Sequence, residues 1–157
     1  MKNKTKKVVN PYFDDEKISE KSHKDEVMEE FKGLNEVVMK MTKGNGKIYA
    51  KPMMDDEAES IFEGNISDSS FYLTFRYAVA DEKGIKHWYR NKFMCISYNE
   101  TFPVWALDIK DDSATPQRFD EKKTFHNYIK EIVNKESFIR SLRRAMYGKV
   151  SIEDEDL

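Results

Sequence analysis

The chain has 157 residues, of which 39% are hydrophobic, 36% are charged and 13% are aromatic. This length suits one domain with one buried core, and the aromatic content excludes a chain that is disordered throughout. Lys and Arg total 27 and Asp and Glu total 29. This balance excludes a uniformly basic nucleic-acid coat protein but leaves room for a local basic face.

The two ends of the sequence carry opposite charge. Residues 1–10 hold four lysines and no acid, whereas residues 149–157 hold four acids and one lysine. Such runs are typical of solvated tails. We therefore predict a flexible basic segment over residues 1–21, a single α+β domain over residues 22–148 and an acidic tail over residues 149–157.

A helix is predicted between residues 22 and 43. Its apolar residues recur at steps of four and three, which places them on one stripe that packs on a sheet. These residues are Val27, Phe31, Leu34, Val38 and Met41. Ser22 and Asp25 form a capping pattern before the helix, and the Gly44-Asn45-Gly46 sequence ends it.

Strands follow the first helix. Residues 47–51 and 60–66 predict two short strands, with an acidic helical turn at 55–60 between them, and residues 71–79 alternate most clearly. The turn sequence at 81–84 predicts a hairpin to a return strand at 85–98. That strand needs a bulge near Asn91 to bring its two apolar halves into phase. A last strand is predicted at 102–110.

Two helices close the domain. The apolar spacing predicts them at about residues 120–134 and 136–147, and Gly148 ends the second. The order is therefore an N-terminal helix, an antiparallel meander of four to five strands and two C-terminal helices packed on the sheet. This order indicates an α+β fold. No motif in the sequence identifies a known family.

Cys95 is the only cysteine and lies in an apolar run. A single cysteine forms no internal disulfide, which favours a cytoplasmic protein, and its apolar neighbours predict a buried, unreactive thiol. The apolar runs are too short to cross a membrane, and no hydrophobic stretch follows the first lysines, so neither a membrane span nor a secretory signal is expected.

The strongest catalytic pattern is Asp108-Ile109-Lys110 at the end of a predicted strand. Metal-dependent nucleases place an acid and a lysine in this way, with the carboxylate on Mg²⁺. The partner acid would have to be Asp81, in a turn. The same acid-x-Lys spacing recurs elsewhere in this charged chain, which makes a surface strand end the simpler interpretation.

Other catalytic and cofactor signals are missing from the sequence. The three histidines, His23, His87 and His126, have no helical metal-binding spacing, and one cysteine cannot build a thiolate zinc site. There is no glycine-rich phosphate loop and no nucleophile elbow. We therefore expect no catalytic residues, metal or cofactor, and favour a protein that is not an enzyme.

Two clusters are candidate partner-binding sites. On the predicted hairpin, Tyr72, Thr74 and Arg76 are expected opposite Tyr89, Arg90 or Lys92. Rings alternating with cations can stack bases and neutralise phosphate. In the last helix, three of the six arginines lie within five residues, at Arg140, Arg143 and Arg144. Cations there complement the helix dipole. They can equally dock the acidic tail at residues 153–156 or an acidic surface of a partner.

The first expectation is a non-catalytic protein-binding module that occupies the surface of a partner protein, as an inhibitor, adaptor or chaperone-like factor. Its Lys-, Asn- and Glu-rich composition is typical of an AT-rich genome, and a phage or mobile-element protein that blocks a host defence enzyme is the most specific form. The alternatives are a nucleic-acid-binding accessory protein that uses the sheet face, and a small nuclease that uses Asp108 and Lys110. A second copy of the chain is a further candidate partner, through the first helix or a sheet edge.

Overall fold

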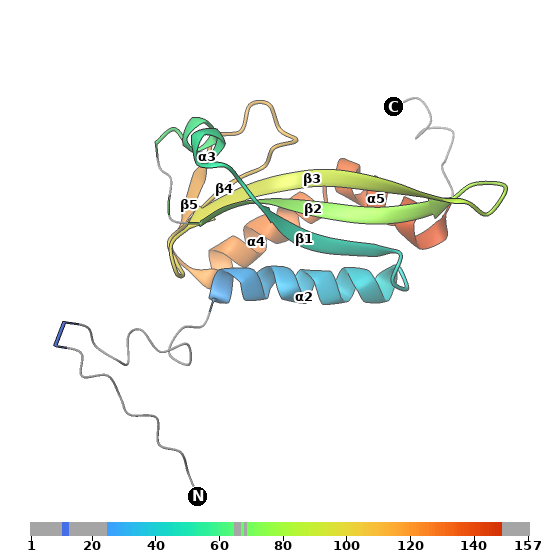
Figure 1. The fold of residues 1–157 in the computed structure, drawn as a ribbon, viewed down its shortest axis with the longest axis horizontal. Coiled ribbons are helices and arrows are strands. Elements are labelled where there is room, and N and C mark those ends of the chain that lie inside the picture. The colour runs from blue at the N-terminus through green and yellow to red at the C-terminus, as the bar shows by residue number, and fades with distance from the viewer. Residues whose placement is uncertain (1–10, 13–24, 65–66, 68, 149–157) are drawn as a thin grey trace, which may run out of the picture.

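The computed structural model describes residues 11–12, 25–64, 67 and 69–148 (Figure 1). Apart from residues 11–12, the predicted basic segment lies outside the described residues. The predicted acidic tail, residues 149–157, also lies outside them, as does the capping candidate Ser22.

Five antiparallel strands form one sheet in the order β1-β2-β3-β4-β5, so each strand pairs with its neighbour in sequence. The strands are β1 (Gly46–Pro52), β2 (Ser69–Ala80), β3 (Lys86–Tyr98), β4 (Val104–Leu107) and β5 (Gln117–Phe119). The helices are α2 (Glu26–Met41), α3 (Asp55–Ile61), α4 (Lys122–Val133) and α5 (Glu136–Tyr147). The predicted α+β meander is confirmed.

The helices cover the two faces of the sheet unequally (Figure 1). Apolar residues of α2, α4 and α5 pack against one face and form the main core with β1 to β4. On the opposite face, Ala58 of α3 and the following Phe62 pack with Cys95 in a smaller cluster. The short α3 lies over one end of that face, and no other helix of the described residues covers the rest of it.

Side chains fix both ends of α2. Asp25 is the N-cap: its carboxylate accepts the backbone N–H of Met28 at 2.9 Å and the hydroxyl of Tyr98 at 2.7 Å, which ties the start of the helix to β3. The predicted capping pair with Ser22 is not tested, because Ser22 lies outside the described residues. At the other end, the Thr42 hydroxyl donates to the carbonyl of Val38 at 2.8 Å and accepts the N–H of Gly46 at 2.9 Å. The helix is therefore anchored to the sheet at both ends.

A bulge in β3 sets which side chains face the helices. Leu73 pairs with Met94 and Thr74 pairs with Lys92, so Phe93 is an extra residue on β3. Phe93 is only 1% exposed and its ring meets that of Phe138 in α5 at 5.1 Å. The predicted bulge is confirmed, two residues beyond Asn91, and from Lys92 back to Lys86 the phase of the strand is reversed.

One strand prediction is wrong and another is too long. Residues 60–61 end α3 and residues 62–64 turn, with φ of 52° at Glu63 and 84° at Gly64, so a strand does not form there; residues 65–66 lie outside the described ranges. The last predicted strand stops at Leu107, because the Asp108 carboxylate turns back to the N–H of Lys110 at 3.0 Å. β5 was missed because it has only three residues.

We expect Phe125→Ala to lower the free energy of unfolding by about 3–5 kcal/mol, the usual cost of removing a buried ring. The Phe125 side chain is fully buried and its ring lies 5.7–5.9 Å from those of Phe31, Phe102 and Phe119, so it joins α4 to three other segments. Denaturant unfolding measures this loss. Tyr147→Ala is the control, because Tyr147 is 66% exposed; equal losses in the two variants would contradict this account of the core.

Candidate functional site

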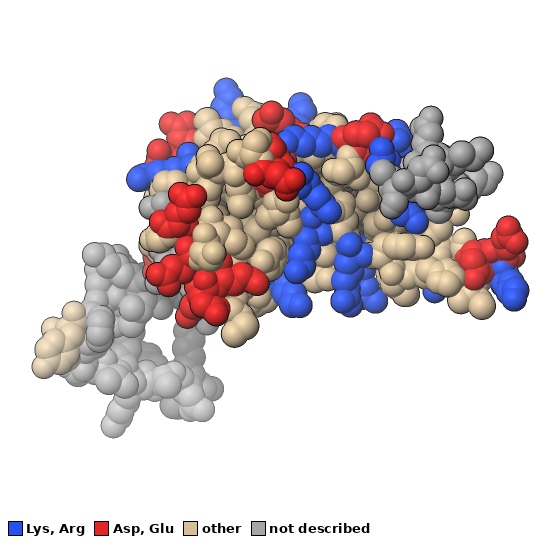
Figure 2. All heavy atoms as spheres, turned by 90° about the horizontal axis from the view of Figure 1, so that it is seen from above, with Lys and Arg blue, Asp and Glu red and all other residues tan. Residues whose placement is uncertain are grey.

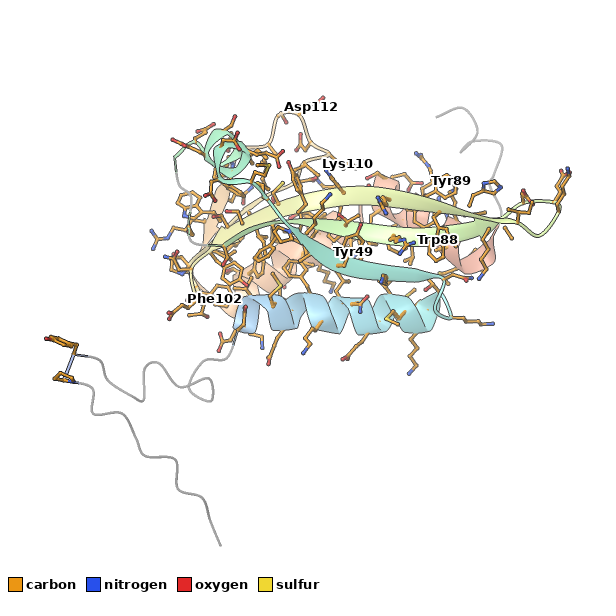
Figure 3. The ribbon with its side chains drawn as sticks, in the orientation of Figure 1. Tyr49, Trp88, Tyr89, Phe102, Lys110 and Asp112 are labelled. Atoms are coloured by element: carbon orange, nitrogen blue, oxygen red, sulfur yellow. The ribbon has the colours of Figure 1, made fainter. Side chains whose placement is uncertain are left out.

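The face of the sheet opposite α2, α4 and α5, beyond the part covered by α3, carries cations and aromatic rings. We call this surface the basic face. Strand alternation and register assign nine residues of β1, β2 and β3 to it. They are Lys47, Tyr49, Lys51, Tyr72, Thr74, Arg76, Trp88, Arg90 and Lys92. Tyr49 on β1 and Trp88 on β3 mark two of its three strands (Figure 3).

Three cations lie in one row across the basic face. Lys47 pairs with Arg76, and Arg76 pairs with Arg90. In the next row, Thr74 lies between Tyr49 and Lys92. Like charges placed directly opposite each other on a sheet are destabilising, so the row is a feature that the fold tolerates rather than one that holds it together.

No acidic residue occurs in β1, β2 or β3. In the described part of the chain, no ion pair joins the five cations of the basic face to a carboxylate. Acids gather instead on α3, which begins with Asp55, Asp56 and Glu57. Figure 2 shows Lys and Arg gathered over the middle of the molecule in this view, with Asp and Glu to their side. Among the described residues, the positive charge of the basic face is therefore not balanced by ion pairs.

Aromatic rings hold two of the cations in place. The guanidinium of Arg76 lies 4.3 Å from the centre of the Trp88 ring, and the ammonium of Lys92 lies 4.3 Å from that of Tyr72. Such contacts stabilise a cation without neutralising it. Arg76 Nε and the hydroxyl of Thr74, which is 2% exposed, have no hydrogen-bond partner. Both atoms are shielded from solvent, so they are unsatisfied polar groups beneath the face and not donors exposed to a ligand.

Tyr72 marks the border between the basic face and α3. It packs partly against the α3 cluster, and burial together with a hydrogen bond to Glu57 raises its pKa well above the usual tyrosine value. Its hydroxyl therefore stays protonated at neutral pH. Tyr72 contributes a ring and a hydroxyl to the site, not a charge.

Of the residues predicted from the hairpin, Tyr72, Arg76, Arg90 and Lys92 come together on the basic face. Tyr89 does not, because it lies on the helix face, stacked on Tyr77 with ring centres 5.4 Å apart. The reason is the bulge at Phe93: in a regular strand Tyr89 would lie on the basic face, and the extra residue moves it to the helix face.

The arginine cluster of α5 is divided among different contacts. The guanidinium of Arg144 lies 4.5 Å from the Tyr89 ring centre, and its Nη1 donates to the Tyr77 hydroxyl at 3.2 Å. Arg143 pairs with Glu136 at 3.0 Å on the exposed side of the helix, and Arg140 is half-buried. These three arginines belong to the helix side of the sheet and do not extend the basic face.

The sequence interpretation missed Lys47, Tyr49, Lys51 and Trp88. A signal was present: the segments that become β1, β2 and β3 contain no Asp or Glu in a chain with 29 acids. The alternation of Lys47, Tyr49 and Lys51 also places all three on one face of a strand.

The structure does not assemble the predicted nuclease pair with its partner acid. Asp108 is 3% exposed and follows β4, where its carboxylate accepts from the ammonium of Lys135 at 2.6 Å. That hydrogen bond raises the pKa of Lys135. Asp81 lies instead in the β2–β3 hairpin, where it contacts His87 at 2.8 Å. Asp108 is thus paired with Lys135, the residue just before α5, which is a structural role.

In the described ranges, no group of three or more His, Cys, Asp and Glu side chains is arranged to hold a metal ion. His126 pairs with Glu30 at 3.0 Å. Cys95 has no exposed surface, and burial raises its pKa to about 12. Within the same ranges, no helix has the length and apolar character needed to cross a bilayer.

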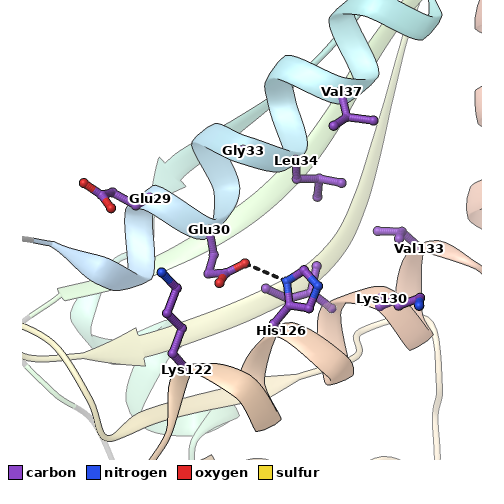
Figure 4. A pocket seen from close by; sticks show the side chains of 10 residues that line it. Glu29, Glu30, Gly33, Leu34, Val37, Lys122, His126, Lys130 and Val133 are labelled. Atoms are coloured by element: carbon purple, nitrogen blue, oxygen red, sulfur yellow. Dashed lines mark hydrogen bonds and ion pairs between the residues drawn. The ribbon is translucent and has the colours of Figure 1, made fainter.

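A groove of about 320 Å³ lies between α2 and α4 on the helix side. Leu34, Val37 and Val133 give it apolar walls, and Glu30 and His126 are joined across it (Figure 4). Among the described residues, the groove is lined by no buried polar atom without a partner that would point to a particular ligand. We therefore treat the groove as a gap between two packed helices.

Comparisons with protein-family models, curated proteins and solved structures find no match to this chain.

We expect Asp108→Asn to lower the free energy of unfolding by about 1–3 kcal/mol, because the Lys135 ammonium loses its carboxylate partner. Thermal unfolding of the variant and the wild-type chain measures this loss of stability. Repeating the wild-type measurement in millimolar Mg²⁺ should show no stabilisation by the ion. Stabilisation by Mg²⁺ that is lost in Asp108→Asn, together with loss of a nuclease activity, would instead support the metal-dependent nuclease.

We expect the Cys95 thiol of the folded chain to resist alkylation by iodoacetamide at about pH 8, because burial and the raised pKa keep it protonated. Intact-mass measurement detects the adduct, and the chain unfolded in guanidinium chloride is the positive control. Rapid alkylation of the folded chain would show that the thiol is accessible and more acidic than we infer.

Proposed function

We propose that this protein is a non-catalytic module that binds single-stranded nucleic acid on the basic face. The observation that carries the proposal is the row Lys47–Arg76–Arg90, which places three cations side by side on strands without a single acid. A polyanion would relieve the repulsion in this row, and release of its counterions would drive binding.

The rings favour a single strand over a duplex. Unpaired bases can stack on exposed aromatic side chains, whereas bases in a duplex are already stacked on each other. Trp88 is 52% exposed and Tyr49 is half-buried, and both lie beside the cation row. Cations and rings on adjacent strands let one surface hold phosphates and bases at the same time.

An acidic surface of a partner protein is the second candidate ligand. The observation that favours it is that Arg76 and Lys92 already lie over the rings of Trp88 and Tyr72, which leaves less ring surface for bases. Tyr, Trp and Arg are also the residues that dominate protein interfaces. The expected roles are then inhibitor, adaptor or chaperone-like factor, including a phage or mobile-element protein that blocks a host defence enzyme. Under either proposal we expect a cytoplasmic setting.

The charge test uses exposed cations whose loss spares the core. We expect the triple substitution Lys47→Ala, Arg90→Ala and Lys92→Ala to weaken binding of oligothymidylate and oligouridylate at least 10-fold at low salt. It should also flatten the dependence of log affinity on log salt concentration by about 2, or about 0.7 for each lost phosphate contact. Fluorescence anisotropy during salt titration measures both quantities.

The matched control removes three exposed lysines of α4, with Lys122→Ala, Lys123→Ala and Lys130→Ala. It changes the net charge by the same amount and should retain nearly all the affinity. Equal weakening by both triple variants would show a bulk charge effect and contradict the proposal. If the wild-type chain has no salt-dependent affinity for any oligonucleotide, while it captures a protein from nuclease-treated lysate that the sheet variant does not, the acidic protein is the ligand.

The ring test uses Trp88→Ala. Loss of one base stack costs about 1–3 kcal/mol, so we expect affinity to fall about 5- to 150-fold while the salt dependence stays unchanged. Tyr147→Ala, an exposed ring on α5, is the control. Unaltered affinity of the Trp88 variant would mean that binding is purely electrostatic and would remove the argument for a single strand.

A further inference from the structure

The described chain ends close to the basic face, on the other side of the same strands. Arg144, in the last turn of α5, contacts the rings of Tyr77 and Tyr89. Tyr77 pairs with Tyr89, and their chain neighbours Arg76 and Arg90 form the adjacent pair. Because successive residues of a strand point to opposite faces, the end of α5 lies directly behind the Arg76–Arg90 pair.

Part of the β3 edge of the sheet is open, so a chain segment can pass around it from one side of the sheet to the other. β4 pairs with β3 only at residues 95–98. Among the residues that the structure describes, the outer side of β3 from residue 86 to 94 therefore has no neighbouring strand. A chain segment that leaves α5 has only this edge to pass in order to reach the basic face.

The segment that follows α5 has the matching charge and enough length. Gly148 ends the helix with φ of 64° and donates its N–H to the carbonyl of Arg144 at 2.8 Å. The next nine residues include four consecutive acids, Glu153 to Asp156. At about 3.4 Å per residue, these acids can lie roughly 17–27 Å from Gly148. Stacked sheets pack about 10 Å apart, so one layer of sheet with its side chains is about that thick and the segment is long enough to pass it.

We propose that the acidic segment, residues 149–157, binds the basic face of its own chain and competes with the external polyanion. Covalent attachment gives the segment a millimolar effective concentration, so even weak ion pairing is populated. Four carboxylates facing the Lys47–Arg76–Arg90 row supply the anions that β1, β2 and β3 lack. The competitive role rests on the proposed function, but binding of the segment to the face does not.

The test neutralises the acidic segment by Glu153→Gln, Asp154→Asn, Glu155→Gln and Asp156→Asn. The first measurement needs no ligand: the ¹⁵N–¹H signals of the Arg76 and Arg90 Nε groups are compared between the wild-type chain and this variant. We expect both signals to shift, and the shift to disappear as salt screens the wild-type contact. The second measurement is oligothymidylate affinity, which should rise about 10-fold.

The control variant neutralises four acids on the opposite side of the sheet, two in α2, one in α4 and one just before α4, and changes the net charge equally. Its substitutions are Glu29→Gln, Glu36→Gln, Glu121→Gln and Glu131→Gln. It should leave both arginine signals in place and change the affinity much less than the segment variant. An equal rise in affinity in both variants would mean that bulk charge explains the effect and would overturn the competitive role.

The two measurements separate this inference from the proposed function. Arginine signals that are the same in the wild-type chain and the segment variant would overturn the inference, whatever the oligonucleotide affinity. Shifted arginine signals in a chain that binds no oligonucleotide, before or after neutralisation, would support the contact of the segment with the basic face and reject nucleic acid as the ligand.

Discussion

The pairing of β2 with β3, with its one-residue bulge at Phe93, is the constraint on which the core and the basic face both depend. Without the extra residue, Lys92, Arg90 and Trp88 would follow the phase of Met94 and point toward α5. Burying two cations there would cost several kcal/mol unless each found a partner. With it, Phe93 enters the core and the cations turn to the opposite face. The same local irregularity therefore protects the core and assembles the site.

Much of the fold could be predicted because its signals are local. The stripe of α2, the alternation of β2, the glycine after α5 and the phase conflict in β3 are each contained in one segment of sequence. The errors also have local physical causes. β5 is held by pairing with β4 rather than by its own pattern, and the turn after α3 uses positive φ at Glu63 and Gly64, which alternation does not reveal.

The site was harder to predict because its residues come together only through the register in which the strands pair. Tyr72, Arg76, Arg90 and Lys92 were identified from one hairpin, but the contribution of β1 depends on which residue lies beside Arg76. Only pairing shows that this residue is Lys47. Tyr89 was assigned to the wrong face because the exact position of the bulge was not known, and the arginines of α5 look like one cluster in sequence although their contacts differ.

The near-neutral total charge of the chain conceals segments of one sign. β1, β2 and β3 carry cations without acids, while α3 and residues 153–156 carry acids in runs. Electrostatic repulsion within a region of one sign destabilises the folded domain, and attraction falls off within about 8–10 Å at physiological salt. A charge pattern of this kind costs stability in the isolated domain. This repulsion is relieved when an anion, from another molecule or from the chain itself, comes within that distance of the cation row.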